Sequence, residues 1–157
     1  MIALGVDLGE RRIGIAVSDR LGSMARPVTV IGHGTLKEDV ARVGELAAHH
    51  QAELIVVGLP LNMDGSAGPA ARRARRFANA LRRELRIEVE LWDERLTTVE
   101  AEETLAGRPV RLRSGLLRAT VEGRRRGQAV DSVAAAIILQ GYLDARREKS
   151  GSDPQSA

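Results

Sequence analysis

Acidic residues stand at positions where the sequence pattern places the ends of secondary-structure elements. Asp7 closes the first apolar run, Asp93 and Glu94 close a later one, and Asp131 opens a strongly apolar segment. Carboxylates that converge repel one another unless a cation neutralises them. Oxygen-only ligands suit Mg²⁺ or Mn²⁺, and a pair of such ions can promote hydrolysis of a phosphodiester bond. These residues are therefore candidate metal ligands.

Each acidic residue also has an ordinary structural interpretation. Asp7 is a turn residue before Gly9 in that interpretation, and the adjacent Asp93 and Glu94 form an ion pair with Arg95. Asp131 is then an N-cap or first-turn residue that the helix dipole favours. The shared placement of all of them at element ends is what favours the chemical interpretation.

Apolar patterning predicts five strands and a mixed sheet. Only a few residues separate the first two strands, so they are expected to pair antiparallel as a hairpin. The later strands alternate with helices, which is typical of parallel pairing between helical layers. The carboxyl ends of parallel strands share one edge, so Asp7 and the Asp93/Glu94 pair should meet there. The predicted strands are Ile2–Val6, Ile13–Val17, Pro27–Ile31, Leu54–Val57 and Glu88–Trp92.

Helical spacing predicts the remaining elements. Helices are expected over 37–50, 69–85 and 130–145, and the capping box Thr97–Glu100 opens a further one. The glycine-punctuated, basic segment 107–127 is expected to form a loosely ordered loop or arm. Residues 1–147 are predicted to form one α/β domain and 148–157 a disordered tail.

Composition narrows the functional classes. The 157 residues include no cysteine, which excludes disulfides and cysteine-ligated zinc. No apolar run approaches the roughly 20 residues that span a bilayer, and the N-terminus lacks a basic leader pattern, so we expect a cytoplasmic protein without membrane contact.

The net charge of +3 hides an uneven distribution. Residues 72–86 contain seven arginines and one glutamate, and residues 108–126 repeat those numbers. Such patches either bind a polyanion or are simply solvated helix faces. Phe77, Trp92 and Tyr142 are the only aromatic residues, too few to stack successive unpaired bases. Nucleic acid would therefore be held by its phosphates and its shape.

Four stretches of the sequence resemble the YqgF/RuvX family of Holliday-junction-resolvase-like proteins in the ribonuclease-H-like superfamily. They are VDLGERRIGIAVSD, VVGLPLNMDGSAGP, LWDERLTTVEAE and VDSVAAAIILQGYLD, in the order of the family over residues 1–145. The resemblance implies a five-stranded mixed sheet flanked by helices. It implies a nuclease dependent on Mg²⁺ or Mn²⁺ that processes the 5′ end of precursor small-subunit ribosomal RNA.

The resemblance also implies residue roles. Asp7, Glu94 and Asp131 match the acids of the family, with Asp93 a less favoured ligand because strand alternation does not decide which neighbour faces the site. Our hypothesis has Asp7 bridging two ions while Glu94 and Asp131 complete one each. The segment before Asp131 is longer and richer in arginine than the family usually has. The residues expected to hold nucleic acid are Arg12, Arg95, Arg124, Arg125, Arg126 and Asn62.

Three alternatives stay open at this stage. The chain could resolve four-way DNA junctions, or it could bind nucleic acid without catalysis, the acids being vestigial. An actin-like or sugar-kinase-like ATPase is disfavoured because such enzymes need two domains and no phosphate-binding glycine motif is present. The sequence leaves open RNA against DNA as substrate, and monomer against homodimer.

Overall fold

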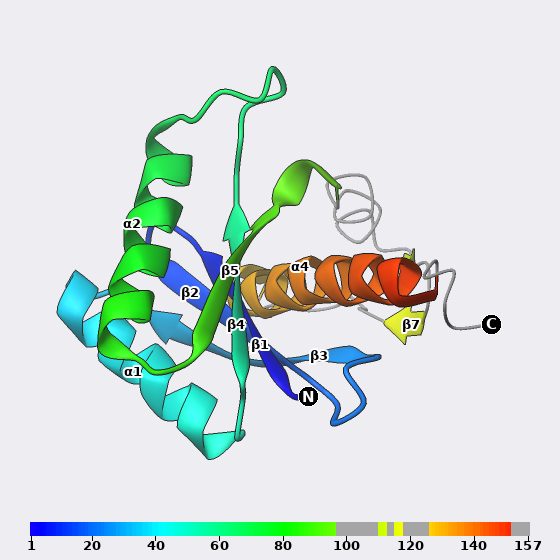
Figure 1. Ribbon diagram of the computed structural model, residues 1–157. Coiled ribbons are helices and arrows are strands. Elements are labelled where there is room, and N and C mark those ends of the chain that lie inside the picture. Colours follow the sequence, from blue (N-terminus) through cyan, green and yellow to red (C-terminus); the bar gives the residue numbers. More distant parts are fainter. Residues whose placement is uncertain (97–109, 113–114, 118–125, 152–157) are drawn as a thin grey trace.

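A five-stranded mixed sheet forms the centre of the molecule (Figure 1). The computed structural model describes residues 1–96, 110–112, 115–117 and 126–151, and the side chains of 1–96 and 131–151 within them. The strand order is β3-β2-β1-β4-β5; β1 pairs antiparallel with β2 and parallel with β4, and β4 pairs parallel with β5. The predicted hairpin and mixed sheet are confirmed. The strands are β1 (Ala3–Leu8), β2 (Arg12–Ser18), β3 (Ala25–Gly32), β4 (Leu54–Leu59) and β5 (Glu88–Asp93).

Helices cover both faces of this sheet. The helices α1 (Leu36–His49) and α2 (Pro69–Glu84) lie on one face, and α4 (Arg126–Gly151) crosses the other (Figure 1). Thr35 caps α1 by accepting a hydrogen bond from the backbone N–H of Glu38 at 3.2 Å. In α2, Pro69 occupies the first turn, where its missing N–H is not needed.

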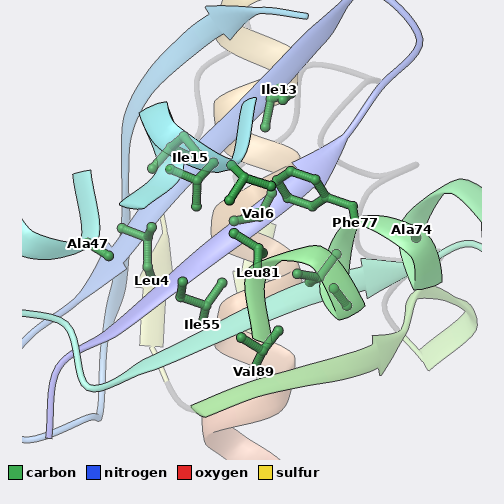
Figure 2. Packing of buried hydrophobic residues seen from close by; sticks show 14 of the residues in the cluster. Leu4, Val6, Ile13, Ile15, Ala47, Ile55, Ala74, Phe77, Leu81 and Val89 are labelled. Atoms are coloured by element: carbon green, nitrogen blue, oxygen red, sulfur yellow. The ribbon is translucent and has the colours of Figure 1, made fainter. Parts of the chain in front are cut away.

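Strand alternation divides the core into two layers. Leu4 and Val6 of β1 pack with Phe77 of α2 in the larger layer, part of which Figure 2 shows. The opposite layer joins the other face of the sheet to α4 and is built from smaller side chains, such as Ala3 and Ala16 against Ala135. This second face admits a helix close to the sheet, because small side chains keep the strands and the helix in near contact.

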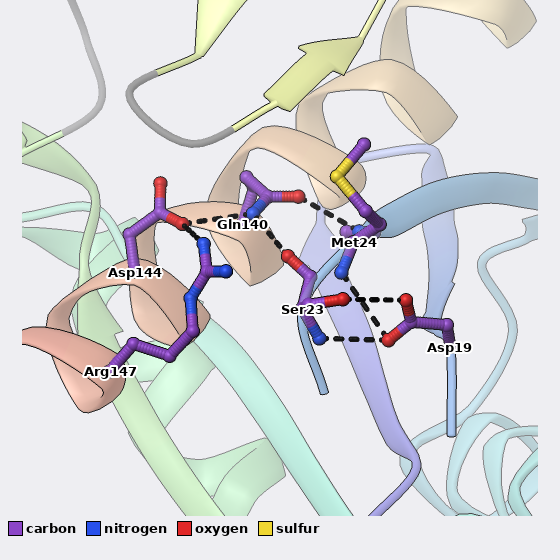
Figure 3. Close-up of polar contacts among 7 residues, drawn as sticks. Asp19, Ser23, Met24, Gln140, Asp144 and Arg147 are labelled. Carbon is purple, nitrogen blue, oxygen red and sulfur yellow. Dashed lines mark hydrogen bonds and ion pairs between the residues drawn. The ribbon is translucent and has the colours of Figure 1, made fainter. Parts of the chain in front are cut away.

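A buried glutamine fixes α4 along its own axis. The side-chain oxygen of Gln140, which has no exposed surface, accepts a hydrogen bond from Ala25 N–H at 2.8 Å. Its amide nitrogen donates to the backbone oxygen of Ser23 at 2.9 Å and to Asp144 at 3.0 Å (Figure 3). The carboxylate of Asp19 in turn accepts a hydrogen bond from the Ser23 hydroxyl at 2.7 Å. The β2–β3 connection is thus tied to the middle of α4.

The structure departs from the predicted elements in the C-terminal third. The segment 107–127 was expected to lack regular structure, and that is wrong in part: β6 (Val110–Leu112) and β7 (Gly115–Leu117) pair antiparallel. The last helix is longer at both ends than the predicted 130–145, and α4 continues past residue 147 to Gly151. The predicted helix at Thr97–Glu100 lies outside the described residues. None of the described helices is long and apolar enough to cross a membrane.

Replacing Gln140 by methionine should destabilise the fold by about 2–4 kcal/mol, because it leaves the buried Ala25 N–H and the Ser23 carbonyl without partners at nearly constant volume. Urea unfolding measures this change. As a control, Asn79→Ala on the exposed side of α2 should stay within about 0.5 kcal/mol of the parent protein. Equal stability of the two variants would contradict the role given to Gln140.

Candidate functional site

Asp7 lies near the carboxyl end of β1 and faces α4. Its neighbour Val6 packs in the larger core layer, and alternation turns Asp7 to the opposite face. In the ladder between β1 and β2, Asp7 pairs with Gly14. The ordinary interpretation of Asp7 as a turn residue therefore does not describe its position, which is within a strand and half-buried.

The second acid reaches this position because Gly14 has no side chain. A Cβ atom at Gly14 would overlap the backbone oxygen of Asp131 in α4. The carboxylate of Asp131 forms an ion pair with Arg12, with 3.2 Å between Arg12 Nε and Asp131 Oδ2. Sequence reasoning placed Arg12 on a substrate phosphate, and the structure gives it a partner inside the protein.

The third acid is Glu94, in the short 3₁₀ helix η1 (Glu94–Leu96) that directly follows β5. A Cβ atom at Gly58 of β4 would overlap Oε1 of Glu94 and come within 2.7 Å of Ile138 in α4. Gly58 was not among the predicted functional residues. The glycine that interrupts the β-branched run before Leu59-Pro60 was the available signal, because a strand glycine marks close approach by another group.

The structure separates the two neighbouring acids that the sequence left together. The carboxylate of Asp93 accepts hydrogen bonds from the guanidinium of Arg95, the shortest at 2.7 Å, and from the backbone N–H of Arg95 at 3.0 Å. This is the ion pair of the ordinary interpretation, although it engages Asp93 alone. Glu94 instead lies against Gly58, within electrostatic reach of Asp7.

Burial and mutual repulsion favour protonation of these acids. Burial, followed by the charge of Asp131, raises the pKa of Asp7 to about 6. Burial, followed by the charges of Asp7 and Asp93, raises the pKa of Glu94 to about 7. The pKa of Asp131 is also raised by burial, although the Arg12 guanidinium opposes that shift. A cluster of carboxyl groups with raised pKa values beside a sheet edge is typical of a functional site.

The donor chemistry of this cluster fits a hard divalent cation. Carboxylate oxygens are the ligands that Mg²⁺ and Mn²⁺ prefer, and a cation would relieve the repulsion that raises the pKa of Asp7 and Glu94. Within the described part of the chain, no three histidine or acidic side chains are gathered closely enough to hold one ion as they stand. Asp131 is paired with Arg12. The three acids therefore offer the donor type that such a cation prefers, but in a looser arrangement than a closed metal site.

The remaining predicted contacts to nucleic acid have mixed outcomes. Asn62 belongs to a closed surface turn: its side-chain amide donates to the Ser66 hydroxyl at 3.0 Å, and its backbone oxygen accepts from Gly65. Arg95 is engaged by Asp93. Arg124 and Arg125 lie outside the described residues, and Arg126 begins α4 without a described side chain. Their binding roles stay predictions.

The family model described as "RuvX: Holliday junction resolvase" matches residues 1–145. The chain belongs to the RuvX family. A Myxococcus xanthus protein named "Putative pre-16S rRNA nuclease" is 47% identical over 147 residues, which cover 94% of this chain and 90% of that protein. A protein of the same name from Anaeromyxobacter dehalogenans is 49% identical over 146 residues, covering 93% of this chain and 98% of that one.

Solved structures with this fold include resolvases. Thermus thermophilus RuvC in complex with a Holliday junction substrate matches with a TM-score of 0.59 at 20% identity, over 94% of this RuvX-family chain and 96% of RuvC. The fowlpox virus Holliday junction resolvase matches with a TM-score of 0.51 at 11% identity, over 92% of this chain and 99% of the viral protein. These similarities confirm the predicted ribonuclease-H-like fold.

Gly14→Ala should destabilise this RuvX-family protein by about 1–3 kcal/mol, because the added methyl group overlaps the backbone of Asp131 and pushes α4 from the sheet. Gly32→Ala is the matched control: it is also a strand glycine, and a Cβ there meets nothing within 4 Å. Urea unfolding of both variants tests the close approach of α4. It is contradicted if Gly14→Ala is as mild as Gly32→Ala.

The raised pKa values predict that the metal-free protein loses stability as the pH rises. In the folded state Asp7 and Glu94 are protonated below about pH 6–7, whereas in the unfolded state they are protonated only below about pH 4. Between these limits the folded state binds more protons, so the unfolding free energy is higher at pH 5 than at pH 8. Asp7→Asn removes its share, about 1–2 kcal/mol between these two pH values. Urea unfolding in EDTA measures the difference between parent and variant, and a difference that does not change with pH would refute the arrangement.

Proposed function

We propose that this chain is a metal-dependent endonuclease that hydrolyses phosphodiester bonds in precursor small-subunit ribosomal RNA. The observation that carries the proposal is the carboxyl cluster of Asp7, Glu94 and Asp131, on the α4 face at the carboxyl edge of the parallel strands. Membership of the RuvX family and the names of the curated relatives support it. Nucleic acid is thus the inferred partner.

Asp7 and Glu94 would hold the cation, Mg²⁺ or Mn²⁺, with Asp131 as a further oxygen ligand. When bound, such an ion supplies Lewis-acid stabilisation of the charge that develops on the phosphoryl oxygens. Asp7 lies between the other two acids in the pattern of charge interactions, since Asp131 acts on Asp7 and Asp7 acts on Glu94. This supports Asp7 as the central ligand of the three. Asp93 is the poorer candidate, because Arg95 occupies its carboxylate.

Arg12 is the residue of the hairpin best placed to bind a substrate phosphate. Its side chain is 45% exposed. Its planar guanidinium can pair with a phosphate in the same way as it pairs with a carboxylate. If Asp131 served as a ligand, Arg12 would lose this partner and would be available for that contact. Cation binding and phosphate binding are then coupled through one side chain.

The family description favours a second candidate, cleavage of four-way DNA junctions. The two candidates share the same acids and differ in substrate. Cleavage of a precursor ribosomal RNA fragment and of a four-way junction should be compared at one salt concentration, since phosphate contacts make affinity depend strongly on salt. Faster cleavage of the RNA is expected, and faster cleavage of the junction would transfer the proposal to DNA.

Asp7→Asn and Glu94→Gln should each lower the cleavage rate at least about 100-fold, because each removes a charged ligand without changing its volume. Asp93→Asn is the matched control, a neutralisation of the adjacent acid in the sequence, and should stay within a few-fold of the parent. Single-turnover cleavage with Mg²⁺ or Mn²⁺ measures all three. An active Asp7→Asn variant would reject the site.

Calorimetry provides a readout that does not require activity. The parent protein should bind Mn²⁺ and Asp7→Asn should not. A parent protein that binds no divalent ion at millimolar concentration would instead support a nucleic-acid-binding protein without catalysis.

A further inference from the structure

The outer side of α2 is covered by arginine. Its inner side packs Ala71, Ala74, Phe77 and Leu81 into the larger core layer. From residue 72 to residue 83, every exposed side chain of the helix is an arginine except Asn79. We call this surface the arginine face; its exposed arginines are Arg72, Arg75, Arg76, Arg82 and Arg83.

Most of this charge has no partner within the part of the chain that the structure describes. None of the ion pairs there includes an arginine of α2. Arg72 and Arg82 do donate hydrogen bonds, to the backbone oxygens of Ala67 and Val89. Arg75, Arg76 and Arg83 make neither a hydrogen bond nor an ion pair with any described residue.

The arrangement is unfavourable for the helix itself. Arg72 lies three and four residues before Arg75 and Arg76, spacings at which like charges on a helix repel. The first turn contains no acidic residue, although negative charge is what the N-terminus of a helix favours. Uncompensated repulsion at this place has no structural benefit in the described residues, so an external anion is the simplest explanation.

The arginine face is separate from the carboxyl cluster. α2 covers one face of the sheet, whereas Asp7 and Asp131 lie on the face that α4 covers (Figure 1). α2 nevertheless begins at the same edge of the sheet, because the connection from the carboxyl end of β4 leads directly to Pro69. A nucleic acid that engages the acids can therefore reach the arginine face only with a second part of its structure.

We propose that the arginine face binds the phosphate backbone of a double-helical arm of nucleic acid, as a second surface distinct from the cleavage site. The proposal rests on the proposed function in one respect, that the substrate is nucleic acid. Residues 72 and 83 lie about 17 Å apart along the helix axis, a length over which a duplex carries on the order of ten phosphates. Arginine, with its planar fork of donors, suits phosphate better than lysine does.

The surroundings favour a nucleic acid over other acidic partners. Protein partners are usually anchored by buried aromatic or aliphatic residues at the centre of an interface, and the stripe from 72 to 83 exposes none. A helix that binds a membrane surface needs an apolar side to insert, whereas the apolar side of α2 is already buried in the core.

The test compares two triple variants of the full chain with equal charge loss. Arg75→Gln, Arg76→Gln and Arg83→Gln are combined in one, and Arg20→Gln, Arg147→Gln and Lys149→Gln in the control. Fluorescence anisotropy with 24-base-pair RNA and DNA duplexes, from 50 to 200 mM salt, gives affinity and salt slope. We expect the first variant to bind at least about tenfold more weakly, with a slope smaller by about 3, and the control to change less than threefold.

Loss with either duplex supports the proposal, and loss with RNA alone assigns the arm to A-form geometry. Equal loss in both triple variants would overturn it, since charge in general would then suffice. Retained duplex binding with lost binding to phosphatidylserine vesicles would also overturn it, in favour of a membrane surface. Urea unfolding should show the first variant to be at least as stable as the parent, because the substitutions relieve repulsion and remove no packing.

The affinity measurement is repeated in the Asp7→Asn background, and cleavage is measured with the parent protein. Comparing the two results separates this proposal from the proposed function. If the parent protein cleaves nothing but the arginine-face variant alone loses affinity, the nuclease proposal fails and the binding surface stands. If cleavage is confirmed but duplex affinity is the same in both triple variants, the binding surface fails and the nuclease stands.

Discussion

The close packing of α4 on glycine positions in three strands is the constraint on which the rest of the structure depends. Gly5 and Gly14 present backbone to the helix where any side chain would collide, and Gly58 leaves room for Ile138 and Glu94 together. Gln140 then sets how far along its axis the helix sits. This packing and this axial position together bring the charge of Asp131 within electrostatic reach of Asp7. The placement of the acids is therefore a consequence of close packing between backbones.

The protein assembles its acids at an electrostatic disadvantage and offsets only part of it. Arg12 neutralises Asp131, which leaves Asp7 and Glu94 half-buried with raised pKa values. Structural carboxylates are usually arranged the other way, as Asp93 is with Arg95, where hydrogen bonds lower the pKa. The adjacent residues 93 and 94 therefore differ: Asp93 is an acid paired within the fold, whereas Glu94 has the raised pKa that is typical of functional sites.

The sequence predicted the sheet, its mixed topology and the position of Asp7 near the carboxyl end of the first strand, because short apolar runs joined by short connections leave few alternatives. It did not decide between Asp93 and Glu94, since that depends on where β5 gives way to η1, a matter of a single residue. The ion pair of Arg12 was missed because it joins β2 to α4, elements more than 100 residues apart in sequence. The β6–β7 pair was missed because three-residue strands carry almost no periodicity.

The ladder between β1 and β2 has a further consequence for how this fold can vary. Val6 and Asp7 point to opposite layers, and Asp7 pairs directly with Gly14. Loss or gain of a single residue within β1 would exchange inside for outside, so that the acid would enter the larger core and a valine would meet α4. Variation in length along this strand is tolerable only in steps of two, whereas the exposed turn between the two strands escapes that parity rule.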